Sequence, residues 1–332
     1  MTYPNGIRTA IALFLVVPFV AGGCDVPGRS SAKAPSAESR SEARVVPVST
    51  TTTTPITATV TPTAPAFTGP VSFDEAQSAY RDKRFEDAFG MFSAYVEERP
   101  ENAWGHYMKG LSAWKAGRLT EAEGALVQAL EIDPAHQKSL VNLARVYLDM
   151  DRPADGLTQA KQALVLTPSS GTALRVAGRA HAELGEVDAA IEAYHQALVS
   201  DDRDAWAMNN LGLILIQQER FEDALPPLAR AVELRGDVAV IHNNLGIALE
   251  RSGYPALAAK VYGETLEIDS SYAKAGANLA RVTGRIDAAV EEDLDLAFLA
   301  QLFVSDIPRW GDSSGVLVEV EPIADDGEET HE

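Results

Sequence analysis

Residues 205–238 read AWAMNNLGLILIQQERFEDALPPLARAVELRGDV, and residues 239–272 read AVIHNNLGIALERSGYPALAAKVYGETLEIDSSY. The two stretches have the same length, and Asn-Asn-Leu-Gly stands at the same place in both. In steps of 34 residues outward from them, the chain carries a small residue at every matching position: Ala76, Gly110, Ala144, Gly178, Gly212, Gly246 and Ala280. A period of this length without an insertion predicts an array of stacked structural repeats.

Within each unit the sequence has the pattern of two antiparallel helices. A second series of small residues marks where the two helix axes approach closely: Ala88, Ala122, Gly156, Ala190, Ala224 and Ala258. Large apolar residues follow at helical spacing in the second helix: Phe92, Leu126, Tyr194, Leu228 and Tyr262. Turn-forming residues separate the two helices: Gly117, Asp151, Gly185 and Gly253. The pattern therefore predicts an all-α chain of helix-turn-helix units.

These positions resemble the tetratricopeptide repeat family. The resemblance implies a right-handed superhelix with a concave groove, here over residues 71–303, with six full units beginning near residues 69, 103, 137, 171, 205 and 239 and a degenerate seventh near residue 273. Pro226 and Pro227 fall inside the second helix of the fifth unit and are expected to kink or delay it. Residues 286–303 retain a helical apolar stripe, which predicts a C-terminal helix that caps the last repeat.

The N-terminal region resembles the export signal of bacterial lipoproteins. An apolar run over residues 10–20 follows Arg8 and is too short to span a bilayer, and small residues precede Cys24. The resemblance implies that residues 1–23 are removed and that Cys24 carries the lipid, which would hold the protein at the inner or outer membrane of a bacterial cell envelope. The alternative is that a general signal peptidase cuts nearby, and Cys24 is then lost or stays a free thiol.

Two further segments lack the composition of a packed core. Residues 24–70 are rich in Pro, Thr, Ser and Ala and predict a disordered tether. Residues 304–332 form an acidic tail that we also expect to be disordered, since residues 311–332 hold eight Asp or Glu and no Lys or Arg.

Composition and motifs argue against nucleic-acid binding and catalysis. The net charge of −20 and the pI near 4.7 disfavour a phosphate backbone as partner. The single cysteine excludes an intramolecular disulfide and a cysteine-based zinc site. No phosphate loop, dinucleotide fingerprint or metalloprotease motif occurs, and His181, His195 and His242 stand apart in sequence. We therefore predict a protein that is not an enzyme, with no cofactor, no metal and no small-molecule substrate.

The candidate binding residues lie on the first helices, where the resemblance places the groove. Asparagine recurs there, which is similar to the asparagine ladder of the O-linked N-acetylglucosamine transferase and to part of the carboxylate clamp of chaperone-binding members. Basic residues lie beside it and favour partners with carboxylates. The candidates are Asn142, Arg145, Arg175, Arg179, Asn209, Asn210, Asn244, Lys274, Asn278 and Arg281. Two alternatives stay open: the asparagines bond neighbouring helices, and Trp104 and Trp206 either anchor a partner or pack between units.

Taken together, these patterns predict a membrane-tethered scaffold that binds other proteins or peptides. The combination of signal, cysteine and repeats resembles the pilotin lipoproteins of type IV pilus systems, and related adaptors act in cell-wall assembly. One alternative is a structural tether between membrane and cell wall. Another is a substrate-docking subunit of an envelope enzyme.

Overall fold

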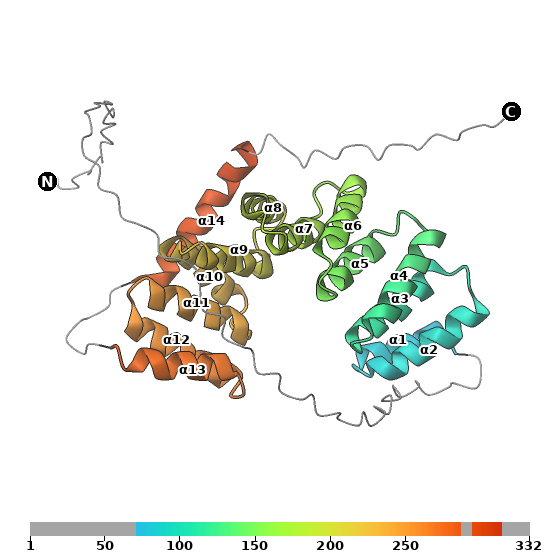
Figure 1. The fold of residues 1–332 in the computed structure, drawn as a ribbon, viewed down its shortest axis with the longest axis horizontal. Helices are drawn as coiled ribbons and strands as arrows, with labels where there is room; N and C mark the ends of the chain where they lie inside the picture. Colours follow the sequence, from blue (N-terminus) through green and yellow to red (C-terminus); the bar gives the residue numbers. More distant parts are fainter. Residues whose placement is uncertain (1–70, 287–293, 314–332) are drawn as a thin grey trace, which may run out of the picture. The chain divides into compact units, whose positions relative to one another are not determined.

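A computed structural model describes residues 71–286 and 294–313, which form helices and no strand (Figure 1). The expected signal peptide, Cys24 and the tether lie outside these residues, as does the acidic tail beyond Ser313. The helices run in the order α1 (Phe73–Arg81), α2 (Phe85–Glu98), α3 (Ala103–Lys115), α4 (Leu119–Ile132), α5 (Gln137–Asp149), α6 (Pro153–Leu166), α7 (Gly171–Glu183), α8 (Val187–Ser200), α9 (Ala205–Gln217), α10 (Phe221–Leu234), α11 (Ala239–Arg251), α12 (Pro255–Ile268), α13 (Ala273–Thr283) and α14 (Leu296–Ser313).

The helices repeat with the period of the sequence. From α3 to α13, each first helix of a unit begins 34 residues after the previous one, and the second helices α2 to α12 do the same. Short polar side chains accept from the first-turn amides of α3, α7 and α9, namely Asn102, Ser170 and Asp204. Such caps satisfy amides that have no partner within the helix, which fixes where each first helix starts.

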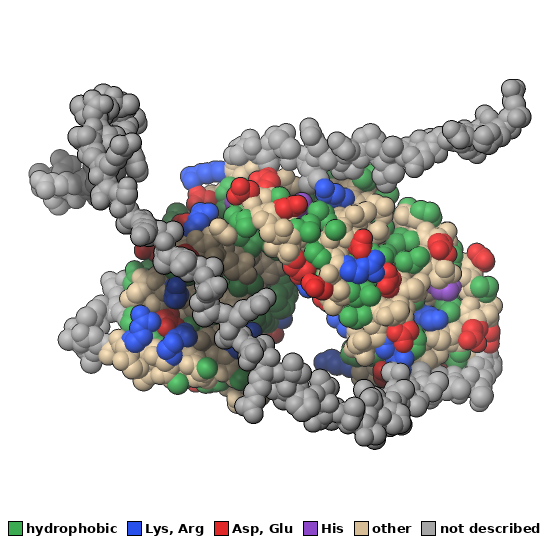
Figure 2. All heavy atoms as spheres, in the orientation of Figure 1, with side chains coloured by type: hydrophobic (Ala, Val, Ile, Leu, Met, Phe, Trp, Pro, Cys, Tyr) green, Lys and Arg blue, Asp and Glu red, His purple; other side chains and the backbone are tan. Residues whose placement is uncertain are grey.

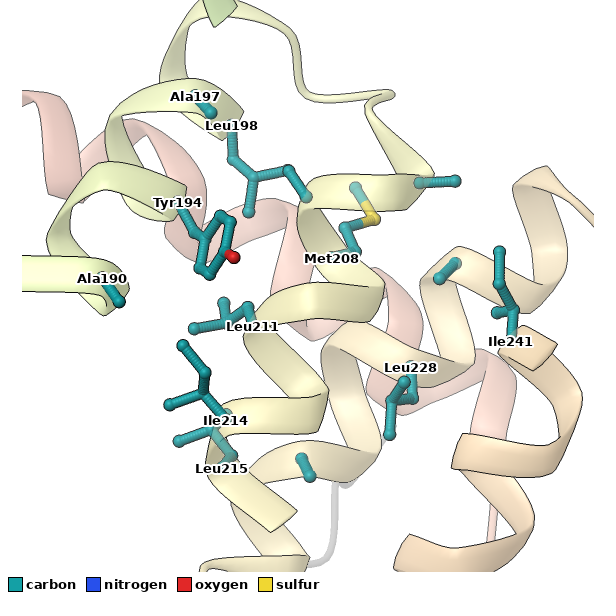
Figure 3. Packing of buried hydrophobic residues seen from close by; sticks show 14 of the residues in the cluster. Ala190, Tyr194, Ala197, Leu198, Met208, Leu211, Ile214, Leu215, Leu228 and Ile241 are labelled. Atoms are coloured by element: carbon teal, nitrogen blue, oxygen red, sulfur yellow. The ribbon is translucent and has the colours of Figure 1, made fainter. Parts of the chain in front are cut away.

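Within a unit, a small residue on the first helix allows the second helix to pack closely against it. A methyl group added at Gly212 of α9 would lie 2.4 Å from Cγ of Leu228 on α10. Tyr194 and Leu198 of α8 pack beside Leu211 and Met208 of α9 in the same core (Figure 3). The small and large series of the sequence are therefore the two sides of one helix contact, as expected.

The contacts between units show which side of the array is concave. Every first helix contacts the first helix of the next unit, from α1 and α3 to α11 and α13. Among the described helices, no second helix contacts the next second helix. Units that touch through their first helices and splay apart at their second helices must curve with the first helices inside. We call the surface formed by α1, α3, α5, α7, α9, α11 and α13 the inner face, and that formed by the second helices the outer face.

The proline pair in α10 has less effect on the helix start than expected. α10 begins at Phe221, at the same place in its unit as the other second helices, and continues through Pro226 and Pro227 to Leu234. The two prolines leave the carbonyls of Glu222 and Asp223 without intrahelical donors. Both of these residues are exposed, so water can satisfy those carbonyls. The expectation of a delayed helix was therefore wrong.

The C-terminal helix exists, but its location and length differ from the prediction. α14 contacts α10 and α8 on the outer face, not α13. Phe303 and Ile307 of α14 are buried in the core that these helices share. The exposed side of α13 carries small residues such as Ala273 and Ala280, which offer little apolar area to a covering helix.

The boundary of the acidic tail also needs correction. α14 extends to Ser313, ten residues beyond the expected end of the helical domain at residue 303. The apolar residues Ile307 and Trp310 explain this extension, because both pack against the core under α14.

Candidate partner-binding face

The inner face holds most of the polar contacts between units. Asn142 of α5 donates from Nδ2 to Oη of Tyr107 on α3 over 3.2 Å. Asn244 of α11 donates to Oδ1 of Asn209 on α9 over 2.9 Å. Asn278 of α13 donates to Oδ1 of Asn243 on α11 over 3.1 Å. Donor and acceptor are separated by 35 residues in all three pairs, so the same bond recurs from one unit to the next.

Several of these asparagines therefore join neighbouring units by hydrogen bonds. Asn142, Asn209 and Asn244 are each less than a tenth exposed, and the amides that they share leave little for a ligand. Asn210 differs, because it is partly exposed and its partners are Asn209 on its own helix and Tyr194 on α8 of the preceding unit. Its Oδ1 accepts from Asn209 over 3.3 Å, and it hydrogen-bonds to Tyr194. Of Asn142, Asn210, Asn244 and Asn278, which share one place in their units, Asn210 is the one that best suits contact with a partner.

Three arginines form a cluster near the middle of the inner face, with Arg145 on α5 and Arg175 and Arg179 on α7. Arg175 donates to Asp204 over 2.7 Å, and Arg179 donates to Asp149 over 3.1 Å and to Glu183 over 2.8 Å. Each of these two guanidinium groups is therefore paired with a carboxylate of a first helix or of its cap.

Arg145 is the member of the cluster without such a pair. It is half-buried and donates to Oδ1 of Asn142 over 3.0 Å, and no ion pair with a carboxylate is found for it among the described residues. Burial lowers the pKa of Arg145, and the positive charges of Arg175 and Arg179 lower it further. Arginine nonetheless stays charged in proteins, so Arg145 presents a positive charge that forms no ion pair with a carboxylate of the described residues.

A second cluster, which sequence reasoning missed in part, lies at the last repeat. Glu250 of α11 is 4% exposed and accepts from Arg281 over 2.6 Å, from Arg285 over 3.0 Å and from Tyr262 over 3.1 Å. Burial alone would raise the pKa of Glu250, but the hydrogen bond from Arg281 and the charge of Arg281 outweigh it and lower the pKa. Arg281 is thus already paired with Glu250, although more than half of its side chain is exposed.

The remaining candidates lie on the exposed part of the inner face. Lys274 at the start of α13 is exposed. Trp104 and Trp206 are 39% and 38% exposed, respectively, and the ammonium of Lys138 lies 4.9 Å from the centre of the Trp104 ring. Both tryptophans therefore combine packing with accessible surface. Acidic and basic side chains are interspersed over the visible part of the molecule, so neither sign dominates that view (Figure 2).

The histidines have structural surroundings. His181 contacts Oε2 of Glu186 through Nδ1 at 2.5 Å, His242 is buried in α11, and His195 stacks on Trp310. Within residues 71–286 and 294–313, no group of three His, Cys, Asp or Glu side chains is placed to hold a metal ion. The helices of this part of the chain include none with the length and apolar character needed to cross a membrane.

A family model described as "Tetratricopeptide repeat" matches residues 73–136, 141–205, 177–237 and 209–273, which is more than half of the chain. The chain belongs to the tetratricopeptide repeat family. Repeats of this family imply a protein–protein interaction scaffold, and proteins built from them are generally non-catalytic.

Two curated relatives and one solved structure illustrate the range of similar tetratricopeptide proteins. Over 131 residues the chain is 29% identical to human tetratricopeptide repeat protein 7B, an alignment that covers 40% of this chain and 16% of that protein. Over 131 residues it is 28% identical to the type IV pilus assembly protein PilF of Pseudomonas aeruginosa, covering 39% of this chain and 52% of PilF. A chain in the crystal structure of the APC/C hetero-tetramer Cut9-Hcn1 matches with a TM-score of 0.57 at 16% identity, over 63% of this chain and 41% of that chain.

The alignments cover only part of each relative. The alignments span 52% of the length of PilF and 16% of the length of tetratricopeptide repeat protein 7B. The likeness to the Cut9-Hcn1 structure, at 16% identity, shows the fold alone.

Proposed function

We propose that this chain is a non-catalytic scaffold whose inner face binds partner segments that carry carboxylates. The observation that carries the proposal is Arg145, a half-buried guanidinium beside Arg175 and Arg179 that has no carboxylate partner among the described residues. A buried positive charge is costly unless it is paired, so a carboxylate supplied by a partner would be favourable there. An arginine can pair with that carboxylate through two parallel hydrogen bonds.

Exposed apolar residues next to the cluster would add contact area. Leu213 of α9 follows Arg179 by 34 residues and is 37% exposed, and Trp206 lies two turns earlier on the same helix. An acidic segment with a few apolar side chains fits this combination. Aromatic and arginine side chains are the residue types that most often dominate binding energy at interfaces.

A photoreactive residue at position 213 would test where partners bind. In cells, the proposal expects crosslinked adducts from position 213 on the inner face and few from position 165, where Val165 is 58% exposed on the outer helix α6. Adducts of equal yield from both positions, or from position 165 alone, would show that partners do not bind specifically at the inner face.

The same proposal includes a lipid anchor on Cys24 in a bacterial cell envelope. What supports it is the sequence around Cys24 and the 28% identity to PilF, a protein named for type IV pilus assembly. Pilus or secretion assembly is the pathway that this similarity favours. A Cys24→Ala variant is expected to lose acyl labelling and to leave the membrane fraction. A wild type that takes no acyl label would refute the anchor and leave the inner-face proposal standing.

Two alternatives give different results in the same cells. A structural tether would need the segment between Cys24 and residue 70, and it would work without the repeats. A docking subunit of an envelope enzyme would crosslink from position 213 to a single enzyme. Neither alternative has an observation in the described residues that favours it over a general scaffold.

A further inference from the structure

The inner face is placed to bind a segment of this same chain. We propose that residues 314–332 occupy the inner face at Arg145, Arg175 and Arg179 of their own molecule and compete there with the carboxylate-bearing partner. This inference rests on the proposed function, because it assumes that the inner face accepts acidic segments.

The composition of residues 314–332 matches the chemistry of that surface. The segment holds seven Asp or Glu and no Lys or Arg, and four apolar residues lie within residues 316–320. Its carboxylates can pair with Arg145, and its apolar residues match the exposed Leu213 and Trp206 nearby. The acidic and apolar parts of the segment therefore have complementary neighbours on one surface.

The helix that precedes the segment, α14, ends close to the cluster. A methyl group added at Gly311 near the end of α14 would lie 3.4 Å from Cγ1 of Val199, in the last turn of α8. A methyl group added at Gly171, the first residue of α7, would lie 3.6 Å from Cβ of Ser200 at the end of α8. Arg175 follows Gly171 by four residues, or about 6 Å along the helix. The end of α14 is therefore separated from Arg175 by little more than the thickness of two helices.

The segment is long enough to cover this distance. Nineteen extended residues reach at most roughly 60–70 Å, whereas a helix with its side chains is only about 10–12 Å across. Because the segment is joined to α14, its effective concentration at the inner face would be about 1 mM. Even a weak contact would then be populated.

The outer face is a poorer target for the same segment. Its arginines at the starts of α4 and α6 already pair with carboxylates of two helices: Arg118 with Glu86 and Glu121, and Arg152 with Glu123 and Asp155. A guanidinium that already faces two carboxylates has little net attraction for a third. Arg145 forms no ion pair within the part of the chain that the structure describes, so the inner face is favoured.

Carbodiimide coupling of the full chain tests the proposal. This reagent joins a carboxylate to a lysine amine as an amide with loss of water, so it records only groups in contact. We expect crosslinks between carboxylates of residues 319–332 and Lys138, which is exposed on α5 of the inner face. Lys260 on α12, whose side chain is 73% exposed, is the control and should gain no such crosslink.

Charge variants and isotope mixing sharpen the result. Arg145→Ala should lower the yield of Lys138 crosslinks about tenfold, the effect of losing one charge-assisted hydrogen bond. Arg235→Ala, which removes an exposed arginine that pairs with Asp237, should leave the yield unchanged. In an equimolar mixture of nitrogen-14 and nitrogen-15 chains, the crosslinked peptides should carry a single isotope. Peptides of mixed isotope would overturn the proposal in favour of binding to a second copy.

The outcomes separate this inference from the proposed function. Absence of Lys138 crosslinks, or equal crosslinking to Lys260, overturns the inference. If partner adducts from position 213 persist in that case and still depend on Arg145, the proposed function stands alone. If the inference holds, removal of residues 314–332 should increase the partner adducts, because the competing segment is gone.

Discussion

Asn244 on α11 donates from Nδ2 to Oδ1 of Asn209 on α9 over 2.9 Å, in a position where both side chains are buried. The bond joins two units across the inner face. Asn244→Ala would leave the Asn209 oxygen without this donor, and we expect a loss of about 1–3 kcal/mol in the free energy of unfolding. Urea denaturation followed by circular dichroism measures this loss.

The matched control for that prediction is Asn210→Ala, at the same place in the preceding unit. Asn210 is partly exposed, so water can replace its hydrogen bonds to Asn209 and to Tyr194 of the preceding unit, and its replacement should change the unfolding free energy by less than Asn244→Ala. An equal loss for the two variants would show that the position stabilises every unit alike and that the distinction between them is wrong.

Glu219 adopts a backbone conformation that glycine prefers. Its φ is 58°, and Gly185 and Gly253, one unit before and one unit after it, have φ values of 79° and 91°. We expect Glu219→Gly to stabilise the protein by about 0.5–1 kcal/mol, because glycine relieves the left-handed strain at a smaller entropic cost. Thermal unfolding checks the sign. Gly185→Ala, which introduces the same strain, should destabilise the protein, and a stabilising result would contradict the explanation.

The packing of α14 on α8 should depend on pH through His195. The imidazole stacks on Trp310 with ring centres 4.1 Å apart, and burial lowers its pKa below the ordinary value of 6.5. The undocked state then binds the proton more tightly than the docked state. Docking should be strongest above pH 6.5 and should weaken as the pH falls from 6.5 toward the lowered pKa.

Hydrogen exchange of the α14 amides measures that pH dependence. Exchange, corrected for its intrinsic pH dependence, should speed up below pH 6.5 in the wild type. His195→Phe keeps an aromatic ring against Trp310 without a titrating group, so its α14 amides should show no such change. A wild type that matches His195→Phe at every pH would rule out this role for His195.

The helical units were predictable from the sequence because their contacts repeat. Gly212 and Leu228 stand 16 residues apart in one unit, and Gly246 and Tyr262 do the same in the next, so a spacing in the sequence corresponds to a contact in space. The turn between the helices repeats as well, although among the described turns glycine stands only at Gly117, Gly185 and Gly253, and the equivalent positions hold Lys83, Asp151 and Glu219.

Features that occur once could not be predicted in this way. The site of α14 depends on α8 and α10, for example on His195, which stacks on Trp310, and no second copy of α14 provides a periodic signal. The Glu250 cluster escaped for a similar reason, since a buried glutamate in α11 has no counterpart at that place in α9, where Ile216 stands. The asparagines were found, but their spacing alone did not distinguish a ladder for a ligand from bonds between helices.

The central claim is that Arg145 is the charge that partners bind. It is tested most directly by measuring partner adducts from the photoreactive residue at position 213 in chains that also carry Arg145→Ala or Arg235→Ala, with circular dichroism to show that both stay folded. The account predicts that Arg145→Ala removes most of the adducts and that Arg235→Ala keeps them. Undiminished adducts in a folded Arg145→Ala chain would contradict it.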